Sequence, residues 1–506
     1  MLITLDGSPL TLTQVAAVAR GQAVVSLGSS TRERLAQART QLERLVEDGL
    51  PHYGVNTGFG SLSRTRIPPD QLRDLQRNLV RSHAAGVGDA LPADTVRAMM
   101  LLLAASLARG ASGVRPIVVE QILALLAHGI TPVVPSIGSV GASGDLAPLA
   151  AVACTLIGEG DVSVAGTRTS ASTALARAGI APLMLEAKEG LALINGTHLM
   201  AAEAALLLTE WETLWPAALV GCAMSIDAAK ATDVFLDARV HALRAQPGQS
   251  TVAARLRALL EGTQIVESHR VNDSRVQDPY SFRCAPAVLG AAVDAVGYVQ
   301  AALAHELAAV TDNPLLVGAN EDRAGVSLIS AGNFHGMPVA LPLDVLAIAL
   351  THVAGIAQQR VFFLLSARDP ESGLPPYLSP SPGLNSGLMV VQYTAAACCN
   401  ELAGLCMPAS VINVPTSAGI EDYNSFGPRA AAKAQRALEL TRTVVAIELL
   451  CAAQALDDHR PLRSGVQVET AHARIRSVVP PLETDRPLTA DIEAIALLIA
   501  TGAFAS

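Results

Sequence analysis

Five long stretches in which apolar residues recur at helical spacing constrain the fold of this 506-residue chain more than any other feature. Half of the residues are hydrophobic and only 3% are aromatic, a composition that suits closely packed helices better than a sheet. Long helices joined by short turns pack as a bundle. We therefore predict a mainly α fold with a long-helix bundle, whose helices cover residues 200–215, 287–310, 339–366, 386–407 and 428–456.

The first third of the chain is more mixed. Two short helices are predicted by capping-box spacings at their starts and by glycines beyond their ends, with a short strand over residues 24–27 between them. The capping pairs are Thr11 with Gln14 and Ser30 with Glu33, and the glycines are Gly21 and Gly49. We expect a smaller mixed domain over residues 1–200 and the bundle over residues 201–506.

Charge and cysteine content exclude several function classes. A net charge of −9 offers no basic surface for nucleic acid or an anionic membrane, and the longest uncharged runs are broken by prolines and glycines, so no membrane span is expected. The seven cysteines are odd in number and lack a C-x-x-C spacing, which indicates reduced thiols in a cytoplasmic protein without an export signal. The eleven histidines show no H-x-x-x-H spacing, so no metal site is predicted.

The segment GASGDLAPLA, residues 141–150, can support unusual chemistry. If the amide nitrogen of Gly144 attacks the carbonyl of Ala142 and Ser143 loses its hydroxyl, two waters leave and a 4-methylidene-imidazol-5-one ring (MIO) remains. This ring is an electrophile made from the chain itself. A side chain at the third position would obstruct ring closure, which is why glycine is needed there. The string alone also suits a turn whose Ser143 or Asp145 caps the following apolar segment as a helix.

Eight motifs spread along the chain occur in an order typical of one family. They are YGVNTGFG (53–60), SHAAGVG (82–88), GASGDLAPLA (141–150), INGT (194–197), VQDPYSFRC (276–284), TDNP (311–314), GNFHG (332–336) and LNSG (384–387). In this order they resemble the aromatic amino acid ammonia-lyases, and among these most closely the histidine enzymes. The resemblance covers about residues 50 to 430. It implies the elimination of ammonia across the α,β bond of an aromatic amino acid.

The resemblance also implies that Ala142, Ser143 and Gly144 form the MIO. The ring would bond the substrate through its amine or, in an older proposal for the family, through its aromatic ring, and the sequence leaves both open. Tyr53 would be the general base that removes the β-proton, and its phenol needs neighbours that stabilise the phenolate. Asn195 would donate to the ring carbonyl and stabilise the negative charge that forms there.

Four further residues would contact the substrate by the same resemblance. Arg283 would hold the carboxylate through its two-pronged guanidinium. Gln277 and Tyr280 would complete the polar wall, with Tyr280 the next candidate for the base, and Phe334 would pack beside the ring or in the core. The family resemblance also implies a homotetramer in which each site draws residues from more than one subunit.

His83 and Glu421 bear on which side chain is eliminated. In the histidine enzymes this pair lies against the imidazole, where a carboxylate accepts a hydrogen bond from a ring nitrogen. Histidine, giving urocanate, is therefore the favoured substrate. Four departures from the usual histidine pattern leave a tyrosine or phenylalanine ammonia-lyase, an aminomutase and an ergothionase-like lyase open. They are Ile420 and Tyr423 in place of glutamine and histidine, Met337 in place of glutamate, and His198 in place of glutamine.

Other classes match less well. Gly28, Ser29 and Ser30 begin the flexible loop of the fumarase and aspartase superfamily, but the continuation of that loop is missing. A pyridoxal-phosphate lyase needs a Schiff-base lysine in a phosphate-binding context, and a nucleotide enzyme needs G-x-x-x-x-G-K; neither pattern occurs. The alternative outside the enzymes is a helical scaffold or pseudoenzyme, against which the intact Ala-Ser-Gly argues.

Overall fold

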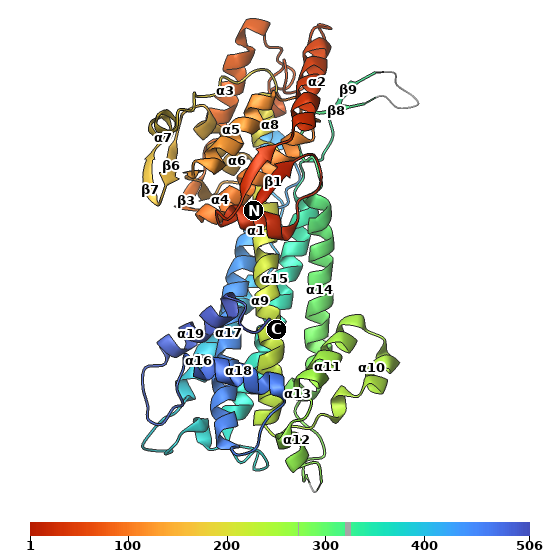
Figure 1. Cartoon of the computed structure of the whole chain (residues 1–506). Coiled ribbons are helices and arrows are strands. Elements are labelled where there is room, and N and C mark those ends of the chain that lie inside the picture. The colour runs from red at the N-terminus through yellow and green to blue at the C-terminus, as the bar shows by residue number, and fades with distance from the viewer. Residues whose placement is uncertain (272, 319–324, 506) are drawn as a thin grey trace. The chain divides into compact units, whose positions relative to one another are not determined.

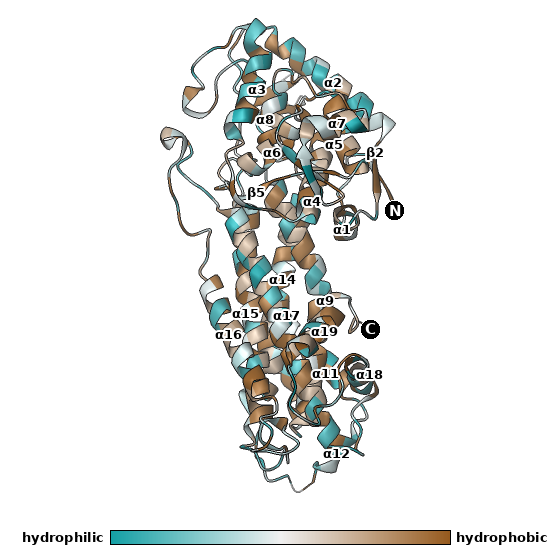
Figure 2. Cartoon of the chain, turned by 90° about the vertical axis from the view of Figure 1, so that its left-hand side faces the viewer, coloured by the Kyte–Doolittle hydropathy of each residue, from teal (hydrophilic) through white to brown (hydrophobic). Residues whose placement is uncertain are grey.

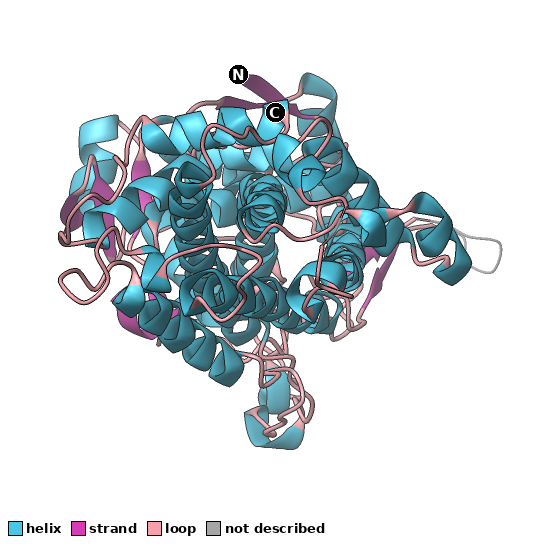
Figure 3. Cartoon of the chain, turned by 90° about the horizontal axis from the view of Figure 1, so that it is seen from below, coloured by secondary structure: helices cyan, strands magenta, loops and turns pink. Residues whose placement is uncertain are grey.

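The computed structural model describes residues 1–271, 273–318 and 325–505, and the chain forms two compact units. The first unit comprises Met1–Leu206, Gln300–Leu343 and Pro408–Ala432, and the second unit comprises Leu207–Val299, Asp344–Met407 and Lys433–Ser506. Helices dominate the described residues (Figure 3), so the prediction of a mainly α fold is confirmed. The predicted domain boundary at residue 200 stays a prediction.

Five long helices supply most of the second unit. They are α9 (His198–Ala228), α14 (Ala285–Glu306), α15 (Met337–Ser366), α16 (Met389–Leu405) and α17 (Gly427–Asp458). The parts of α9, α14, α15 and α17 that belong to this unit run side by side (Figures 1 and 2), which confirms the predicted bundle. Each predicted apolar stretch falls on one of these helices, although α9 continues past Pro216 to Ala228.

Buried polar pairs join these helices within the second unit. Arg360 of α15 donates to both carboxylate oxygens of Glu448 on α17, and Ser225 of α9 donates to the same carboxylate at 2.9 Å. Lys433 of α17 lies 3.2 Å from the carboxylate of Asp344 on α15. Because removing one partner would leave a buried charge uncompensated, these pairs restrict how the helices can pack.

The helices α14 and α15 are long and apolar enough to cross a membrane, by length and composition only. The prediction that no segment resembles a span is therefore wrong as a statement about length and composition. Core helices of bundles meet the same criterion. In α15, Asp344 and Arg360 form ion pairs with α17, as expected for a packed bundle helix.

Shorter helices complete the second unit. They are α10 (Ala238–Arg244), α11 (Pro247–Leu259), α12 (Gln264–Ser268), α13 (Tyr280–Arg283), α18 (Val466–Arg476) and α19 (Thr489–Ala500). The four-residue helix α13 lies inside the VQDPYSFRC motif. Its Phe282 is buried and meets the ring of Phe363 edge-on, with ring centroids 5.1 Å apart, which anchors the motif to α15.

The first unit combines short helices with small sheets. Its helices are α1 (Leu12–Ala19), α2 (Ser29–Val46), α3 (Leu72–His83), α4 (Ala93–Ala108), α5 (Pro116–Ala127), α6 (Leu146–Leu156), α7 (Ala171–Ala178) and α8 (Glu189–Ile194). Of these, α4 is almost entirely buried, whereas α2 and α3 carry many hydrophilic residues (Figure 2). The 3₁₀ turns of the chain are Gly60–Leu62, Pro69–Gln71, Val234–Leu236, Pro376–Leu378 and Ser417–Gly419.

The strands of the first unit form small separate sheets. β1 (Leu2–Leu5) pairs in parallel with β2 (Val24–Leu27), which confirms the predicted strand. The antiparallel pairings are β3 (Val87–Ala90) with β5 (Pro135–Ile137), β4 (Ile130–Pro132) with β6 (Asp161–Val164), β6 with β7 (Thr167–Ser170), and β8 (Leu315–Val317) with β9 (Ser327–Ile329).

Only one of the two predicted capping boxes forms. Thr11 accepts from the backbone of Gln14, whose side chain accepts in return from Thr11, so this prediction is confirmed. The prediction of a capping box at Ser30 and Glu33 is wrong, because α2 begins at Ser29 and its N-cap is Gly28. Gly28 approaches the backbone of Leu5 on β1, so pairing of the strands sets where this helix starts.

Candidate active site

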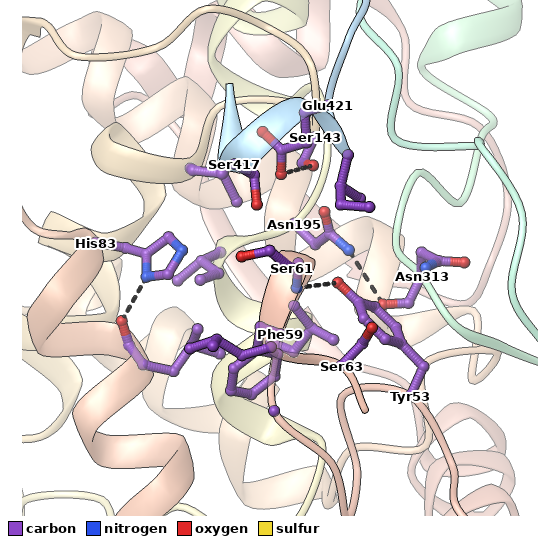
Figure 4. Close-up of a pocket in the computed structure, with 18 of the residues that line it drawn as sticks. Tyr53, Phe59, Ser61, Ser63, His83, Ser143, Asn195, Asn313, Ser417 and Glu421 are labelled. Carbon is purple, nitrogen blue, oxygen red and sulfur yellow. Dashed lines mark hydrogen bonds between the residues drawn. The ribbon is translucent and has the colours of Figure 1, made fainter. Parts of the chain in front are cut away.

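The first unit contains a pocket of about 1160 Å³ (Figure 4). Its walls come from the segment 53–67, from α3, from the Ala-Ser-Gly loop, from the end of α8 and from residues near 313, 330–335 and 417–423. Every residue that lines it belongs to the first unit. The lining includes seven of the predicted site residues: Tyr53, His83, Ala142, Ser143, Asn195, Phe334 and Glu421.

The Ala-Ser-Gly loop is held by a close backbone approach to the INGT motif. Gly144 forms an isolated bridge with Gly196, whose N–H donates to the carbonyl of Ser143 at 3.3 Å. Gly144 has a φ of +73°, and a Cβ there would lie 2.1 Å from the carbonyl oxygen of Gly196, so only glycine fits. Ala142 and Gly144 are buried, whereas Ser143 is partly exposed to the pocket. The tripeptide therefore meets the size requirement for ring closure.

Asp145 ties this loop to the start of α9, whereas the sequence suggested a side-chain cap on α6. Its side chain does not cap α6; its carboxylate instead accepts from the backbone N–H groups of Leu199 and Met200, in the first turn of α9, at 2.8 and 3.2 Å. Ser139 donates to the other carboxylate oxygen at 3.3 Å. Complete burial raises the pKa of Asp145 to about 7. Asp145 does occupy the N-cap position of α6, but no side-chain capping hydrogen bond forms there, so the alternative interpretation of this string, a turn whose side chain caps the next helix, is wrong.

Glu421 contacts Ser143 directly. The Ser143 hydroxyl donates to Oε1 of Glu421 at 3.2 Å, and the Thr416 hydroxyl donates to Oε2 at 3.0 Å. The backbone of Thr416 and Glu421 also forms an isolated antiparallel bridge, which fixes the carboxylate at the pocket wall (Figure 4). Thr416 lies outside the eight motifs that carry the family resemblance, so nothing in the sequence pointed to it.

Tyr53 and His83 lie on other parts of the wall. The phenol oxygen of Tyr53 accepts from the backbone N–H of Gly60 at 3.2 Å, a contact within one motif. His83 ends α3, and its Nδ1 lies 2.8 Å from the carbonyl oxygen of Leu79 and 3.1 Å from the Ser82 hydroxyl. A ring N–H at Nδ1 would satisfy the Leu79 carbonyl and leave Nε2 as an acceptor toward the pocket.

Asn195 is held by a residue that the sequence did not place in the site. Its Nδ2 donates to the backbone carbonyl of Asn313 at 3.1 Å. Its Oδ1 is buried and has no hydrogen-bond partner among the described residues. The TDNP motif contained Asn313, but the motif gave no reason to connect it with Asn195, which lies 118 residues earlier.

Gln277, Tyr280 and Arg283 are not among the residues that line this pocket, and they belong to the second unit. Tyr280 is 69% exposed. The guanidinium of Arg283 lies 4.4 Å from the Tyr280 ring centroid, and its Nε donates to the Asp278 carbonyl at 2.9 Å. The first unit of the chain therefore brings together Ser143, Tyr53 and Glu421, the residues predicted to form the ring, to act as base and to contact the substrate side chain. The second unit carries Arg283, the residue predicted to bind the substrate carboxylate.

The charged groups of the pocket are of one sign. Glu421 and Asp422 line it, and no lysine or arginine does among the described residues. Four residues depart from the pattern usual in the histidine enzymes. Of these, Ile420 and Tyr423 line the pocket, whereas Met337 and His198 do not. His198 is buried beside Gly196, both of its ring nitrogens lack partners within the described structure, and burial lowers its pKa to about 3.

Comparison with known proteins identifies the family. The sequence profile of a family described as aromatic amino acid lyase matches residues 10–477. The chain belongs to this family. It is 49% identical over 509 aligned residues to a histidine ammonia-lyase of Anaeromyxobacter dehalogenans (strain 2CP-C), with 99% of each chain covered.

Solved structures of aromatic amino acid lyases and aminomutases have a similar fold. A histidine ammonia-lyase from Trypanosoma cruzi has a TM-score of 0.91 at 37% identity, covering 100% of this chain and 94% of that one. Tyrosine aminomutase from Streptomyces globisporus has a TM-score of 0.92 at 34% identity, covering 100% and 98%. This chain is therefore a carbon–nitrogen lyase that acts on an amino acid, and aromatic lyases of its family are generally MIO-dependent.

Proposed function

We propose that this lyase eliminates ammonia from L-histidine to give urocanate. The observation that carries the proposal is the position of Glu421, a carboxylate held by Thr416 within 3.2 Å of the Ser143 hydroxyl. A carboxylate there can accept from an imidazole N–H, and His83 across the pocket can contact the second ring nitrogen. The similarity to proteins called histidine ammonia-lyase supports the same substrate.

Ala142, Ser143 and Gly144 would form the MIO. The buried neighbours, the positive φ of Gly144 and the lack of room for a Cβ at that position support ring closure. The ring would supply an electrophile that makes the amine a better leaving group. The amide of Asn195 would donate to the ring carbonyl, since its Nδ2 is already held near the loop by Asn313.

Tyr53 would remove the β-proton at its phenol oxygen. The N–H of Gly60 already donates to that oxygen at 3.2 Å, which helps to hold the phenol at the pocket wall. Phe334 would pack against the substrate ring. His83 and Glu421 would orient the substrate imidazole, with the Glu421 carboxylate accepting from a ring N–H and the His83 ring packing beside the imidazole.

Arg283 would hold the substrate carboxylate, with Gln277 and Tyr280 completing the polar wall. Because these residues are absent from the pocket lining of one chain, we propose a homotetramer in which other copies of the chain supply them. The carboxylate of the substrate needs such a cation, since the pocket itself carries two carboxylates. All seven cysteines are free thiols, which supports a cytoplasmic location for the enzyme.

The substrate assignment is tested by incubating the purified protein with histidine, tyrosine, phenylalanine and ergothioneine. The conjugated product is followed by ultraviolet absorption, and any β-amino acid is followed by chromatography. We expect histidine to have the highest kcat/KM and no β-amino acid to form. A preference for tyrosine or phenylalanine, or accumulation of a β-amino acid, would replace histidine elimination with the corresponding lyase or aminomutase reaction.

Glu421→Gln sharpens this test. The change keeps the size of the side chain but removes the charge that an imidazole N–H would meet, so we expect turnover of histidine to fall far more than turnover of any phenyl substrate. Asp422→Asn is the matched control, because Asp422 is the next residue and lines the same pocket, whereas the Ser143 hydroxyl donates to Glu421. Equal losses for the two variants would contradict a specific role of Glu421.

A further inference from the structure

Lys188 is a buried charge that the proposed mechanism does not use. It is one of three lysines in the chain, its side chain is 0% exposed, and its Nζ donates to Oδ2 of Asp312 at 2.5 Å. The Asp312 side chain is 2% exposed. Burial lowers the pKa of Lys188, and the charge of Asp312 opposes that shift. Burying two charges is costly, so the pair needs a reason beyond stability.

The position of Lys188 in the chain supplies that reason. Lys188 immediately precedes α8, and Asn195 immediately follows it. At the far end of this six-residue helix, Nδ2 of Asn195 donates to the carbonyl of Asn313 at 3.1 Å. Asp312 and Asn313 are consecutive, so both ends of α8 are tied to one dipeptide.

The dipeptide is itself fixed. Oδ1 of Asp312 accepts from the backbone N–H of Asn313 at 2.6 Å, so the carboxylate that meets Lys188 also sets the orientation of the next peptide. The Asn313 side chain accepts from the N–H of Ala331 at 2.7 Å and donates to the Ser330 hydroxyl at 3.1 Å. A shift of Asp312 therefore moves the carbonyl that holds Asn195.

We propose that Lys188 is a positioning residue for Asn195, acting through Asp312 and Asn313. The inference rests on the proposed function, in which Asn195 donates to the carbonyl of the ring formed at Ser143. Such a donor acts only when it is held in place, and a displacement of about 1 Å can cost on the order of a hundredfold in rate. Lys188 is not among the residues that line the pocket.

A double-mutant cycle tests this proposal, with Lys188→Met, Asn195→Ala and the two combined, assayed on histidine. We expect Lys188→Met to lower kcat by about tenfold or more while KM changes less than about threefold, because the lost interaction is with the ring and not with free substrate. The combined variant should be no slower than Asn195→Ala alone, since Lys188 acts through that residue. Losses that multiply in the combined variant would overturn the proposal.

Arg115→Met is the matched control. Arg115 pairs at 2.7 Å with Glu189, the first residue of α8 and also fully buried, so this variant breaks an ion pair at the same helix end without touching Asp312. Its effect should multiply with that of Asn195→Ala. If Lys188→Met does not fold, Asp312→Asn replaces it in the cycle, because asparagine can still accept from the Asn313 N–H but carries no charge.

Hydrogen exchange separates this inference from the proposed function. Lys188→Met should speed amide exchange at Asn313, and Arg115→Met should not, whatever reaction the enzyme catalyses. Absence of urocanate formation by the wild-type protein would reject the proposed function alone. Unchanged exchange at Asn313 in Lys188→Met would reject the link through the dipeptide, and with it the positioning role.

Discussion

The two units use buried charges differently. In the second unit, Arg360 with Glu448 joins one long helix to another, and both helices already bury extensive apolar faces. In the first unit, Lys188 with Asp312 ties a loop to a helix of six residues. Short segments bury little apolar surface, so polar contacts have to set their positions. In the second unit the buried ion pair therefore adds to the apolar packing of two long helices, whereas in the first unit the buried ion pair itself positions the six-residue helix α8.

The same contrast divides the proposed site. The groups that would act on the reacting bonds, Ser143, Tyr53 and Asn195, lie in the first unit, whereas Arg283 lies in the second. Substitutions of Ser143, Tyr53 and Asn195 should therefore affect kcat, and substitution of Arg283 should affect KM.

The largest effect is expected for Ser143→Ala, which should abolish turnover because no exocyclic methylidene carbon can form without the serine hydroxyl. The wild-type chain should be lighter than its sequence mass by two waters, with the loss in the peptide that contains Ser143. Intact and peptide mass spectrometry check both statements. Active wild-type protein of unmodified mass would reject the MIO.

Tyr53→Phe should lower kcat by about a hundredfold or more, because the variant keeps the ring but loses the oxygen that would take the β-proton. Steady-state kinetics on histidine measures the change. A variant with near-normal kcat would move the base elsewhere, and Tyr280 of the second unit would be the next residue to test, which would break the division between the units.

Arg283→Lys should mainly weaken substrate binding, by roughly 1.5 to 3 kcal/mol, since lysine keeps the charge but loses the bidentate geometry. KM should therefore rise by about tenfold or more while kcat changes little. In mixed tetramers formed from Arg283→Lys and Ser143→Ala chains, sites with the wild-type KM should appear only if a site combines residues of different chains. Mixtures that show only the raised KM of Arg283→Lys would contradict shared sites.

The smallest effect concerns stability and pH, and it is predicted for His198→Gln. The folded protein holds His198 neutral down to a pKa of about 3, whereas an unfolded histidine takes up a proton near pH 6.5. Its contribution to stability is therefore present above pH 6.5 and is lost as the pH falls toward 3. Glutamine does not titrate.

Between pH 7 and pH 5 the wild-type protein should lose about 1 to 2 kcal/mol more of its unfolding free energy than His198→Gln does. Denaturant unfolding at several pH values measures the difference. Asp145, whose pKa is raised to about 7, contributes in the opposite sense, but it is present in both proteins and cancels in the comparison. Parallel pH profiles would mean that His198 takes up its proton at the same pH in the folded and unfolded states, and would contradict this prediction.

Local pattern in the sequence determined much of the fold. Apolar periodicity located the long helices, because each helix buries its own repeating face, and the Thr11 capping box involves residues only three apart. The pattern failed at Asp145, whose carboxylate caps a helix that begins more than fifty residues later. It also failed at Ser30, where strand pairing set the start of the helix.

The site divides in the same way. The motifs, read through a family resemblance, named Tyr53, Ser143, Asn195 and Glu421 from the sequence alone. Only the tertiary structure brought Glu421 to Ser143 across 278 residues and Lys188 to Asp312 across 124. Contacts at such separations leave no periodic or local trace in a single sequence, because they depend on how whole segments fold back on one another; for the same reason the roles of Thr416 and Asn313 emerged only in three dimensions.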